Sequence, residues 1–182
     1  PAKTWKPIEQ ATMSYGHGIS VSLIQMARAY LAFAREGELV PLSLTRVEGQ
    51  PTKGRRIFSP ETTQVVRNML ESVTQPGGTA TKAQVAGYRV GGKTGTAVKL
   101  ENGRYTKRYI ASFVGFAPVS NPRLVVAVMI DEPSAGKYYG GQIAGPVFSR
   151  IAGDTLQTLG VEPDAPFETM ISPMVALRKE GV

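Results

Sequence analysis

The stretch from about residue 92 to 131 constrains the fold most, because its pattern predicts an antiparallel meander of three strands. Strands are expected at about 92–100, 109–116 and 124–131. Asn102-Gly103, between the first two, is a strong signal for a short hairpin turn. The third strand is a near-continuous apolar run, which is typical of a strand covered on both faces. The pattern therefore predicts an antiparallel sheet built from neighbours in sequence.

Three further stretches have the apolar spacing of helices that pack on such a sheet. The first, at about 22–35, opens with Ser22 followed by Gln25, which fits a capping box, and we expect it to be strongly buried. The second begins after Ser59, with Pro60 at its first position. The last spans about 146–159.

The segments between these elements are expected to be irregular. Residues 1–20 are predicted to form a loop, 49–56 a basic turn and 132–144 another loop, while a short helical turn is expected near 79–85. The whole is an α+β fold, an antiparallel meander packed with helices. We divide it into a domain over 1–160 and an extended C-terminal tail over 161–182.

Composition narrows the function classes. The 182 residues are 42% hydrophobic and 19% charged, as in a soluble globular protein. The absence of cysteine excludes disulfides and a thiol nucleophile, and a single histidine, His17, excludes a multi-histidine metal site. The net charge of +7 comes from scattered Lys and Arg without a nucleic-acid-binding motif, so no nucleic-acid partner is predicted.

The segment Gly91–Ala97 carries the chemistry, since it combines a cation, two hydroxyls and three glycines at the start of a strand. Side chains alternate along a strand, so Thr94 and Thr96 are expected on one face and Lys93 on the other. Two hydroxyls on one face can bind a carboxylate. A glycine at Gly95 lets a substrate backbone lie close to the strand.

These motifs follow an order that resembles the C-terminal part of the transpeptidase domain of class B penicillin-binding proteins, of the division-specific (FtsI) type. That fold is shared with serine β-lactamases. The resemblance covers nearly the whole chain and is weakest in the tail. It rests on the following segments: Ser14–Gly18, Gly77–Ala80, Gly92–Ala97, Gly115–Pro118, Ile130–Pro133 and Tyr138–Gly141.

The resemblance implies roles for the residues of the Lys-Thr-Gly segment. Thr94 and Thr96 would bind the terminal carboxylate of a D-Ala-D-Ala stem peptide or of a β-lactam, and the backbone N–H of Thr96 would supply half of an oxyanion hole. Lys93 would raise the local positive potential and assist proton transfer. Gly95 would let the substrate lie flat. No cofactor is implied.

Three tyrosines, Tyr109, Tyr138 and Tyr139, match an aromatic wall beside the cleft in the resembled family, although ordinary packing on the meander would also explain them. Val98 stands where several relatives carry arginine, so a cationic contact from that position is not expected here. His17 stands where tyrosine is more frequent, and its expected role is structural.

Two motifs of the resembled family, Ser-x-x-Lys with the acylated serine and Ser-x-Asn, precede the Ser-Tyr-Gly segment and are not in this sequence. Ser134-Ala-Gly-Lys137 matches the first pattern only formally, because it follows the Lys-Thr-Gly strand in a glycine loop. The chain is therefore expected to be part of a longer enzyme and inactive alone.

The resemblance also implies a setting for the longer protein. It would work at the periplasmic face of the inner membrane, anchored by an N-terminal segment outside this chain, with division membrane proteins and a septal glycosyltransferase as partners. Two alternatives remain open from the sequence. One is a β-lactamase or β-lactam sensor of the same fold, and the other is a binding module that docks to a division partner without chemistry.

Overall fold

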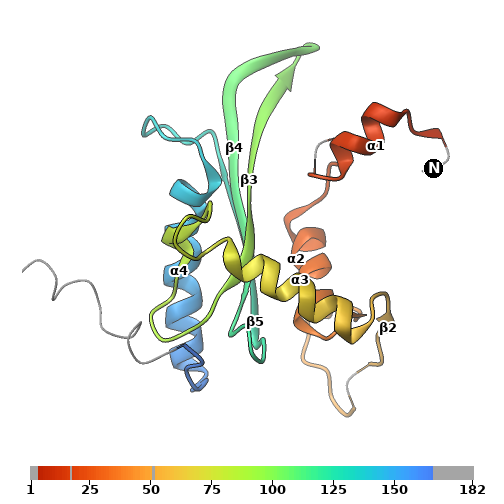
Figure 1. Cartoon of the computed structure of the whole chain (residues 1–182), viewed down its shortest axis with the longest axis vertical. Coiled ribbons are helices and arrows are strands. Elements are labelled where there is room, and N and C mark those ends of the chain that lie inside the picture. The colour runs from red at the N-terminus through yellow and green to blue at the C-terminus, as the bar shows by residue number, and fades with distance from the viewer. Residues whose placement is uncertain (1–3, 17, 51, 166–182) are drawn as a thin grey trace, which may run out of the picture.

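The computed structural model describes residues 4–16, 18–50 and 52–165, and it confirms the antiparallel meander. The strands are β3 (Gly91–Glu101), β4 (Arg104–Ala117) and β5 (Leu124–Asp131), in the order β3-β4-β5 (Figure 1). Asn102 and Gly103 both have positive φ, 50° and 75°, as a two-residue hairpin turn between twisted strands requires. The Asn-Gly prediction is thus confirmed.

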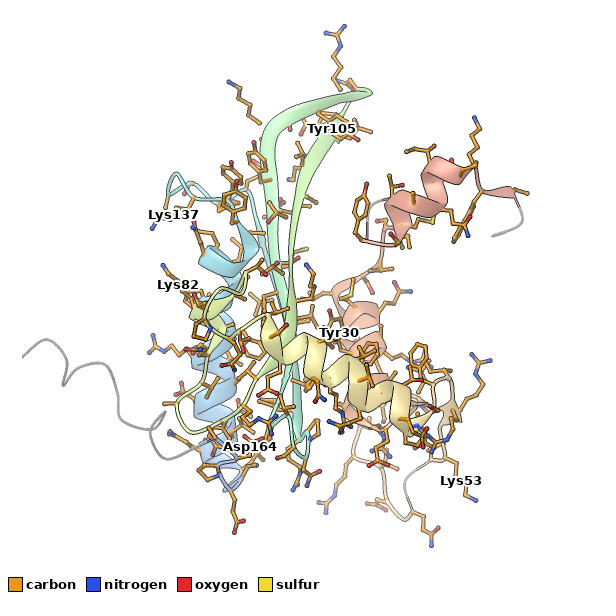
Figure 2. All side chains as sticks on the ribbon, viewed as in Figure 1. Tyr30, Lys53, Lys82, Tyr105, Lys137 and Asp164 are labelled. Atoms are coloured by element: carbon orange, nitrogen blue, oxygen red, sulfur yellow. The ribbon has the colours of Figure 1, made fainter. Side chains whose placement is uncertain are left out.

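The first hairpin is longer than its sequence pattern predicts. β4 starts at Arg104 instead of about 109, whereas β5 pairs with β4 only from Ile110 onward. Residues 98–109 therefore form a two-stranded arm that projects beyond the sheet, with Tyr105 near its far end (Figures 1 and 2). A two-stranded ribbon without a core is marginal on its own.

Ion pairs join the base of this arm to the end of β5. Lys99 Nζ lies 2.7 Å from Asp131 Oδ1 and 2.6 Å from Glu132 Oε1. Arg108 Nη1 lies 3.3 Å from the same glutamate oxygen, and its Nη2 pairs with Glu101. The arm is therefore held by charged side chains in place of buried apolar ones.

One face of the sheet is covered by helix α4 (Gly140–Thr158), which begins six residues before the predicted start at 146. The prediction placed Pro146 at the first helical position, where proline is most frequent, but the helix here contains it. The earlier start depends on Gly140 and Gly141, whose lack of side chains lets the helix begin against the sheet. The core lies between α4 and the strands, with Phe113, Phe148 and Leu156 fully buried.

The other face carries α2 (Leu23–Ala34) and α3 (Pro60–Ser72), as Figure 1 shows. Both predicted caps are present. Ser22 Oγ accepts from the Gln25 N–H, and Gln25 Oε1 accepts from the Ser22 N–H at 2.8 Å, which completes the capping box. Ser59 caps α3 ahead of Pro60. Both α2 and α4 contact β5, in agreement with the expectation of cover on two faces.

Three sequence predictions in the N-terminal half are wrong. Residues 7–13 form a short helix, α1 (Pro7–Met13), in place of a loop, started by Pro7 and by Glu9 Oε2, which accepts from the Lys6 N–H at 2.7 Å. The predicted basic turn contains β2 (Arg55–Arg56), paired with β1 (Glu38–Leu39). Helix α2 is not strongly buried. Among its residues Ala32 alone is buried, and Ile24 is 54% exposed, because no described element covers its outer face.

The chain returns to the sheet after α4. Tyr88 Oη donates to the Val161 carbonyl at 2.6 Å, and Asp164 accepts from the N–H groups of Arg89 and Ser120 at 2.7 and 3.0 Å. The rest of the predicted tail, 166–182, lies outside the described residues. The helical turn expected near 79–85 is present as the 3-10 helix η2 (Thr81–Ala83). Within the described residues, no helix has the length and apolar character needed to cross a membrane.

Candidate active site

The Lys-Thr-Gly segment lies on β3, which is an edge strand of the described sheet. In the described part of the chain, β3 pairs with β4 alone, in a register that places Gly95 opposite Ser112. Alternate backbone N–H groups of an edge strand point away from its partner and remain available to a ligand. The strand therefore offers main-chain donors along the same edge that carries Lys93 and the two threonines.

The two threonine hydroxyls are held by segments distant in sequence. Thr94 Oγ1 lies 3.2 Å from Thr79 Oγ1, and Thr96 Oγ1 accepts a hydrogen bond of 3.1 Å from the Gly140 N–H. Thr79 and the start of α4 are neighbours, since a Cβ on Gly141 would lie 2.0 Å from the Thr79 carbonyl oxygen. The arrangement agrees with the expectation that both threonines point to one side of β3.

The bond from Gly140 determines how the Thr96 hydroxyl can act. A hydroxyl has one proton to donate and two lone pairs, and here the backbone N–H occupies a lone pair. The proton is left free to donate to an anion, and Thr96 is exposed. Its hydroxyl is therefore presented as a donor.

Gly140 must be glycine for α4 to start there. A Cβ at this position would lie 2.2 Å from the Ser112 carbonyl oxygen and 2.5 Å from that of Gly95. Both atoms belong to the sheet backbone and cannot rotate away. The lack of a side chain thus brings the N-terminal end of α4 within hydrogen-bond distance of Thr96.

Lys93 lies on a different wall. Its Nζ donates to the Thr94 carbonyl at 3.1 Å, and its side chain lines an open pocket of about 480 Å³. The remaining lining residues are Ser72, Val73, Pro76, Gly77, Gly78 and Thr79. The ammonium group therefore brings positive charge to a space between the end of α3 and β3.

Gly95 faces the Ser112 side chain across the sheet. A Cβ there would lie 2.4 Å from Ser112 Oγ on the paired strand. Rotation of the Ser112 hydroxyl could relieve this contact, so the predicted role of Gly95 in substrate approach remains a prediction.

The three predicted tyrosines come together beside β3. The rings of Tyr109 and Tyr138 stack with centroids 4.2 Å apart, and those of Tyr138 and Tyr139 lie 4.5 Å apart. Tyr138 Oη donates to Tyr139 Oη at 3.3 Å, and this hydrogen bond is the main reason that the pKa of Tyr138 is raised. Tyr139 is exposed, so part of this aromatic surface is open to a ligand.

Sequence reasoning missed two residues of this site, Thr79 and Gly140. Each stands in a glycine-containing motif, and those glycines were the available signal, but no pattern connects either residue to β3. His17 falls outside the described residues. Ser134 and Lys137 lie in an exposed irregular loop before α4, as predicted for a chance match. Within the described residues, no cluster of three His, Asp or Glu side chains could hold a metal ion.

Comparison with known proteins identifies similar sequences over most of the chain. Residues 1–153 match the family model of the penicillin binding protein transpeptidase domain. The chain is 53% identical over 165 residues to a probable peptidoglycan D,D-transpeptidase PenA of Neisseria gonorrhoeae, covering 90% of this chain and 28% of that protein. It is 46% identical over 162 residues to the peptidoglycan D,D-transpeptidase FtsI of Escherichia coli K12, covering 88% and 27%.

Solved structures show the same similarity. The transpeptidase domain of Burkholderia pseudomallei penicillin-binding protein 3 superposes with a TM-score of 0.85 at 58% identity, which covers 91% of this chain and 51% of that one. The α+β fold class predicted from the sequence is therefore confirmed. The chain spans about half of the solved domain and 28% and 27% of the length of the PenA and FtsI proteins.

Proposed function

Because the chain belongs to the penicillin-binding protein transpeptidase domain family, we propose that it forms the Lys-Thr-Gly wall of a peptidoglycan D,D-transpeptidase. The whole enzyme would cross-link stem peptides and would be acylated by β-lactams. Its nucleophile and the Ser-x-Asn serine would come from polypeptide outside these 182 residues. The division into a domain over 1–160 and a tail over 161–182 is part of this proposal.

In the proposed reaction, a serine hydroxyl attacks the carbonyl carbon between the two D-alanines of the donor peptide. The bond to the terminal D-Ala breaks, that residue leaves as the free amino acid after taking a proton, and an acyl-enzyme remains. An amine of a second stem peptide then displaces the serine. This chain supplies the groups that bind the donor and stabilise the oxyanion, not the nucleophile.

Each residue of the wall has a part in that scheme. Thr96 donates a hydrogen bond from its hydroxyl to the terminal carboxylate of the donor peptide. Thr94, two residues earlier on β3, binds the same carboxylate. The backbone N–H of Thr96, on the open edge of β3, is half of the oxyanion hole, and such a donor is typically worth about 2.7–4 kcal/mol. Lys93 adds positive potential that favours an anionic substrate and aids proton transfer. One side of the donor peptide is covered by the rings of Tyr109, Tyr138 and Tyr139.

One observation carries the proposal: the Gly140 N–H occupies a lone pair of the exposed Thr96 hydroxyl, which leaves the hydroxyl proton free to donate to a ligand. A threonine that merely packed in the sheet would need no such orientation. The resemblance to the division-specific type extends the proposal to septal wall synthesis, with a division glycosyltransferase and membrane proteins as partners. The enzyme would lie at the periplasmic face of the inner membrane, anchored by a segment outside this chain.

The test is acylation by labelled penicillin, measured by mass spectrometry and stopped-flow kinetics. In the longer protein, Thr96→Val keeps the shape of the side chain, removes its hydroxyl and leaves the backbone N–H in place. We expect acylation to lose on the order of 1–3 kcal/mol of transition-state stabilisation. Thr106→Val, the same change on the arm, should leave the rate unaltered. The 182-residue chain alone should form no adduct.

Two results would contradict the proposal. An unchanged acylation rate in the Thr96→Val protein would show that this hydroxyl does not bind the ligand. A stable acyl adduct on the isolated chain, for instance on Ser134, would show that the nucleophile was assigned to the wrong part of the protein.

A further inference from the structure

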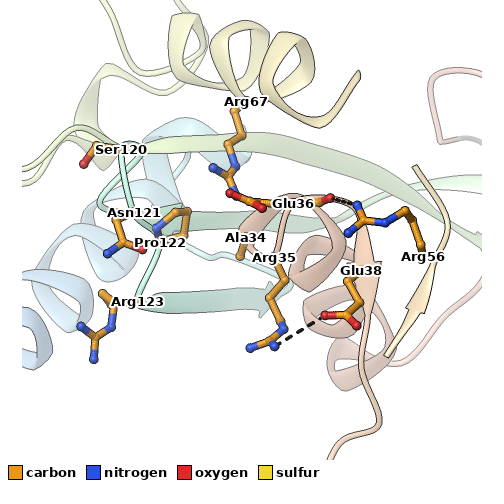
Figure 3. Close-up of a pocket in the computed structure, with 10 residues that line it drawn as sticks. All are labelled: Ala34, Arg35, Glu36, Glu38, Arg56, Arg67, Ser120, Asn121, Pro122 and Arg123. Carbon is orange, nitrogen blue, oxygen red and sulfur yellow. Dashed lines mark hydrogen bonds and ion pairs between the residues drawn. The ribbon is translucent and has the colours of Figure 1, made fainter. Parts of the chain in front are cut away.

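The pocket beside Lys93 is also lined by Thr79, a residue that has no part in the proposed transpeptidase chemistry. The hydroxyl of Thr79 lies 3.2 Å from that of Thr94. In another open pocket, of about 420 Å³ at the end of α2, the Glu36 carboxylate stands beside Arg67, so that charge is met within the chain (Figure 3). Of these two hollows, the one beside Lys93 therefore contains the polar side chain that lies against the proposed site without a role in it.

The backbone of Thr79 is held independently of its side chain. The N–H of the next residue, Ala80, donates to the Val73 carbonyl at 2.9 Å. The start of α4 packs on the Thr79 carbonyl, where a Cβ on Gly141 would lie 2.0 Å from the oxygen. These contacts involve main-chain atoms, and Thr79 is exposed. Replacement of its side chain should therefore leave the fold in place.

The contact between Thr79 and Thr94 differs from the other pairs of Ser and Thr hydroxyls in the described chain. One of those lies within the loop at 43–45, and the other lies within the cap of α3 at 59–62. Thr79 and Thr94 are 15 positions apart and belong to a loop and to β3. Within the described residues, the Thr79 hydroxyl bonds to Thr94 alone. This contact is therefore no local cap or turn.

A bound carboxylate determines the direction of this hydrogen bond. Each hydroxyl has one proton and two lone pairs, so either of the two can donate when no ligand is bound. A carboxylate only accepts, so Thr94 donates to it and keeps a lone pair that can accept from Thr79. The arrangement matches that of Thr96, whose hydroxyl accepts from the Gly140 N–H. Linked hydroxyls also polarise one another, which strengthens the bond to the anion.

We propose that Thr79 is a positioning residue of the transpeptidase site. It donates a hydrogen bond from its hydroxyl to Thr94 and so leaves the Thr94 proton for the carboxylate of the ligand. This inference rests on the proposed function, because the ligand is the donor peptide or β-lactam that bears the carboxylate. Thr79 and Gly140 each orient one threonine, from two segments that meet at the start of α4.

The experiment measures acylation of the longer protein by labelled penicillin, with the dissociation constant of the initial complex and the acylation rate constant determined separately. The carboxylate is present in the ground state and in the transition state alike, so loss of Thr94 orientation should weaken binding and leave the rate constant unchanged. We expect Thr79→Val to raise the dissociation constant about threefold to tenfold. Thr79→Ser, which keeps the hydroxyl, should match the parent. Thr81→Val removes an exposed hydroxyl two residues along the chain and should have no effect.

Two comparisons separate an action through Thr94 from a general disturbance of the site. The methyl ester of the same penicillin lacks the carboxylate, so the parent and Thr79→Val should react with it alike. In a Thr94→Val background, Thr79→Val should cause no further loss, because the hydroxyl that it orients is gone. An equal loss with the methyl ester, or a full additional loss in that background, overturns the proposal, since Thr79 would then support the fold or contact the ligand itself.

The proposed function and the role of Thr79 fail in different ways. A parent protein that penicillin does not acylate contradicts the proposed function, and the role of Thr79 falls with it. If the parent is acylated and Thr96→Val impairs the reaction, but Thr79→Val binds penicillin as the parent does, the role of Thr79 alone is overturned.

Discussion

The helices on the two faces of the central sheet, α2 and α4, have apolar stripes but are buried to very different extents. On the α4 face, Phe113, Phe148 and Leu156 are fully buried, and the rings of Phe113 and Phe148 meet edge to face at 4.8 Å. On the α2 face, Leu23 and Ile24 are exposed although they stand at the spacing of a packed helix. An apolar stripe therefore indicates that a helix face tends to be buried, but it does not show whether this chain contains the segment that buries it.

This difference in burial agrees with how much of the transpeptidase domain fold the chain contains. The chain covers 51% of the solved transpeptidase domain to which it is similar. The α4 face is completed by residues of this chain, from Val73 to Val161.

The largest effect is expected from Phe148→Ala on the α4 face. Removing a fully buried ring leaves a cavity and should cost about 3–5 kcal/mol of unfolding free energy, measured by denaturant titration of the chain. Ile24→Ala removes a side chain that is 54% exposed and should cost less than about 0.5 kcal/mol. Equal losses for the two variants would show that the α2 face is packed in solution.

A smaller effect is expected from Gly140→Ala, which tests how closely the N-terminal end of α4 packs on the sheet. The added methyl would meet two sheet carbonyls, so we expect a loss of about 1–3 kcal/mol, with slower β-lactam acylation of the longer protein as Thr96 loses its partner. Gly153→Ala is the matched control on the same helix. Its Cβ would lie 3.4 Å from Val85, and alanine's helix propensity should offset that contact. A stable Gly140→Ala chain with normal acylation would contradict the assigned contact.

The smallest effect concerns the arm, which neither face supports. The hydrogen bond from Lys99 is the main reason that the pKa of Glu132 is lowered from its ordinary value of 4.5. A carboxyl with a lower pKa in the folded state contributes stability above pH 4.5 and loses it as the pH falls through the folded-state pKa. The protection of the arm amides against hydrogen exchange, relative to the intrinsic rate at each pH, should therefore fall below pH 4.5, whereas the protection of the apolar α4 core should not change over the same range.

Salt gives the control for that prediction. Exposed ion pairs are screened, so high salt should reduce the acid effect, and Glu132→Gln should remove it. If the arm amides of Glu132→Gln still respond to acid as the parent does, the ion pairs do not hold the arm.

Much of the secondary structure could be predicted because its signals are local. The Asn-Gly turn, the Ser22 capping box and the Ser59-Pro60 start all depend on residues within a few positions of one another. The start of α4 was misplaced because the proline rule outweighed the glycines before it. Helix α1 was missed because residues 1–20 were taken as one Pro-, Gly- and Ser-rich loop, although residues 7–13 contain one Pro and no Gly.

The candidate site divides in the same way. Its charged and hydroxyl groups stand together in Lys93-Thr94-Gly95-Thr96, so alternation along a strand was enough to place Lys93 apart from the two threonines. The contact that orients Thr96 joins residues 44 positions apart. No periodicity or short motif reports a contact at that separation.

By itself, the sequence determined the type and order of most elements and the segment that carries the chemistry, because caps, turns and side-chain alternation act over a few residues. Tertiary structure alone decided which apolar faces are buried, where Gly140 meets Thr96, and that Thr79 lies beside Thr94. These depend on distances between chain segments far apart in sequence, and such distances are determined by how the helices pack on the sheet.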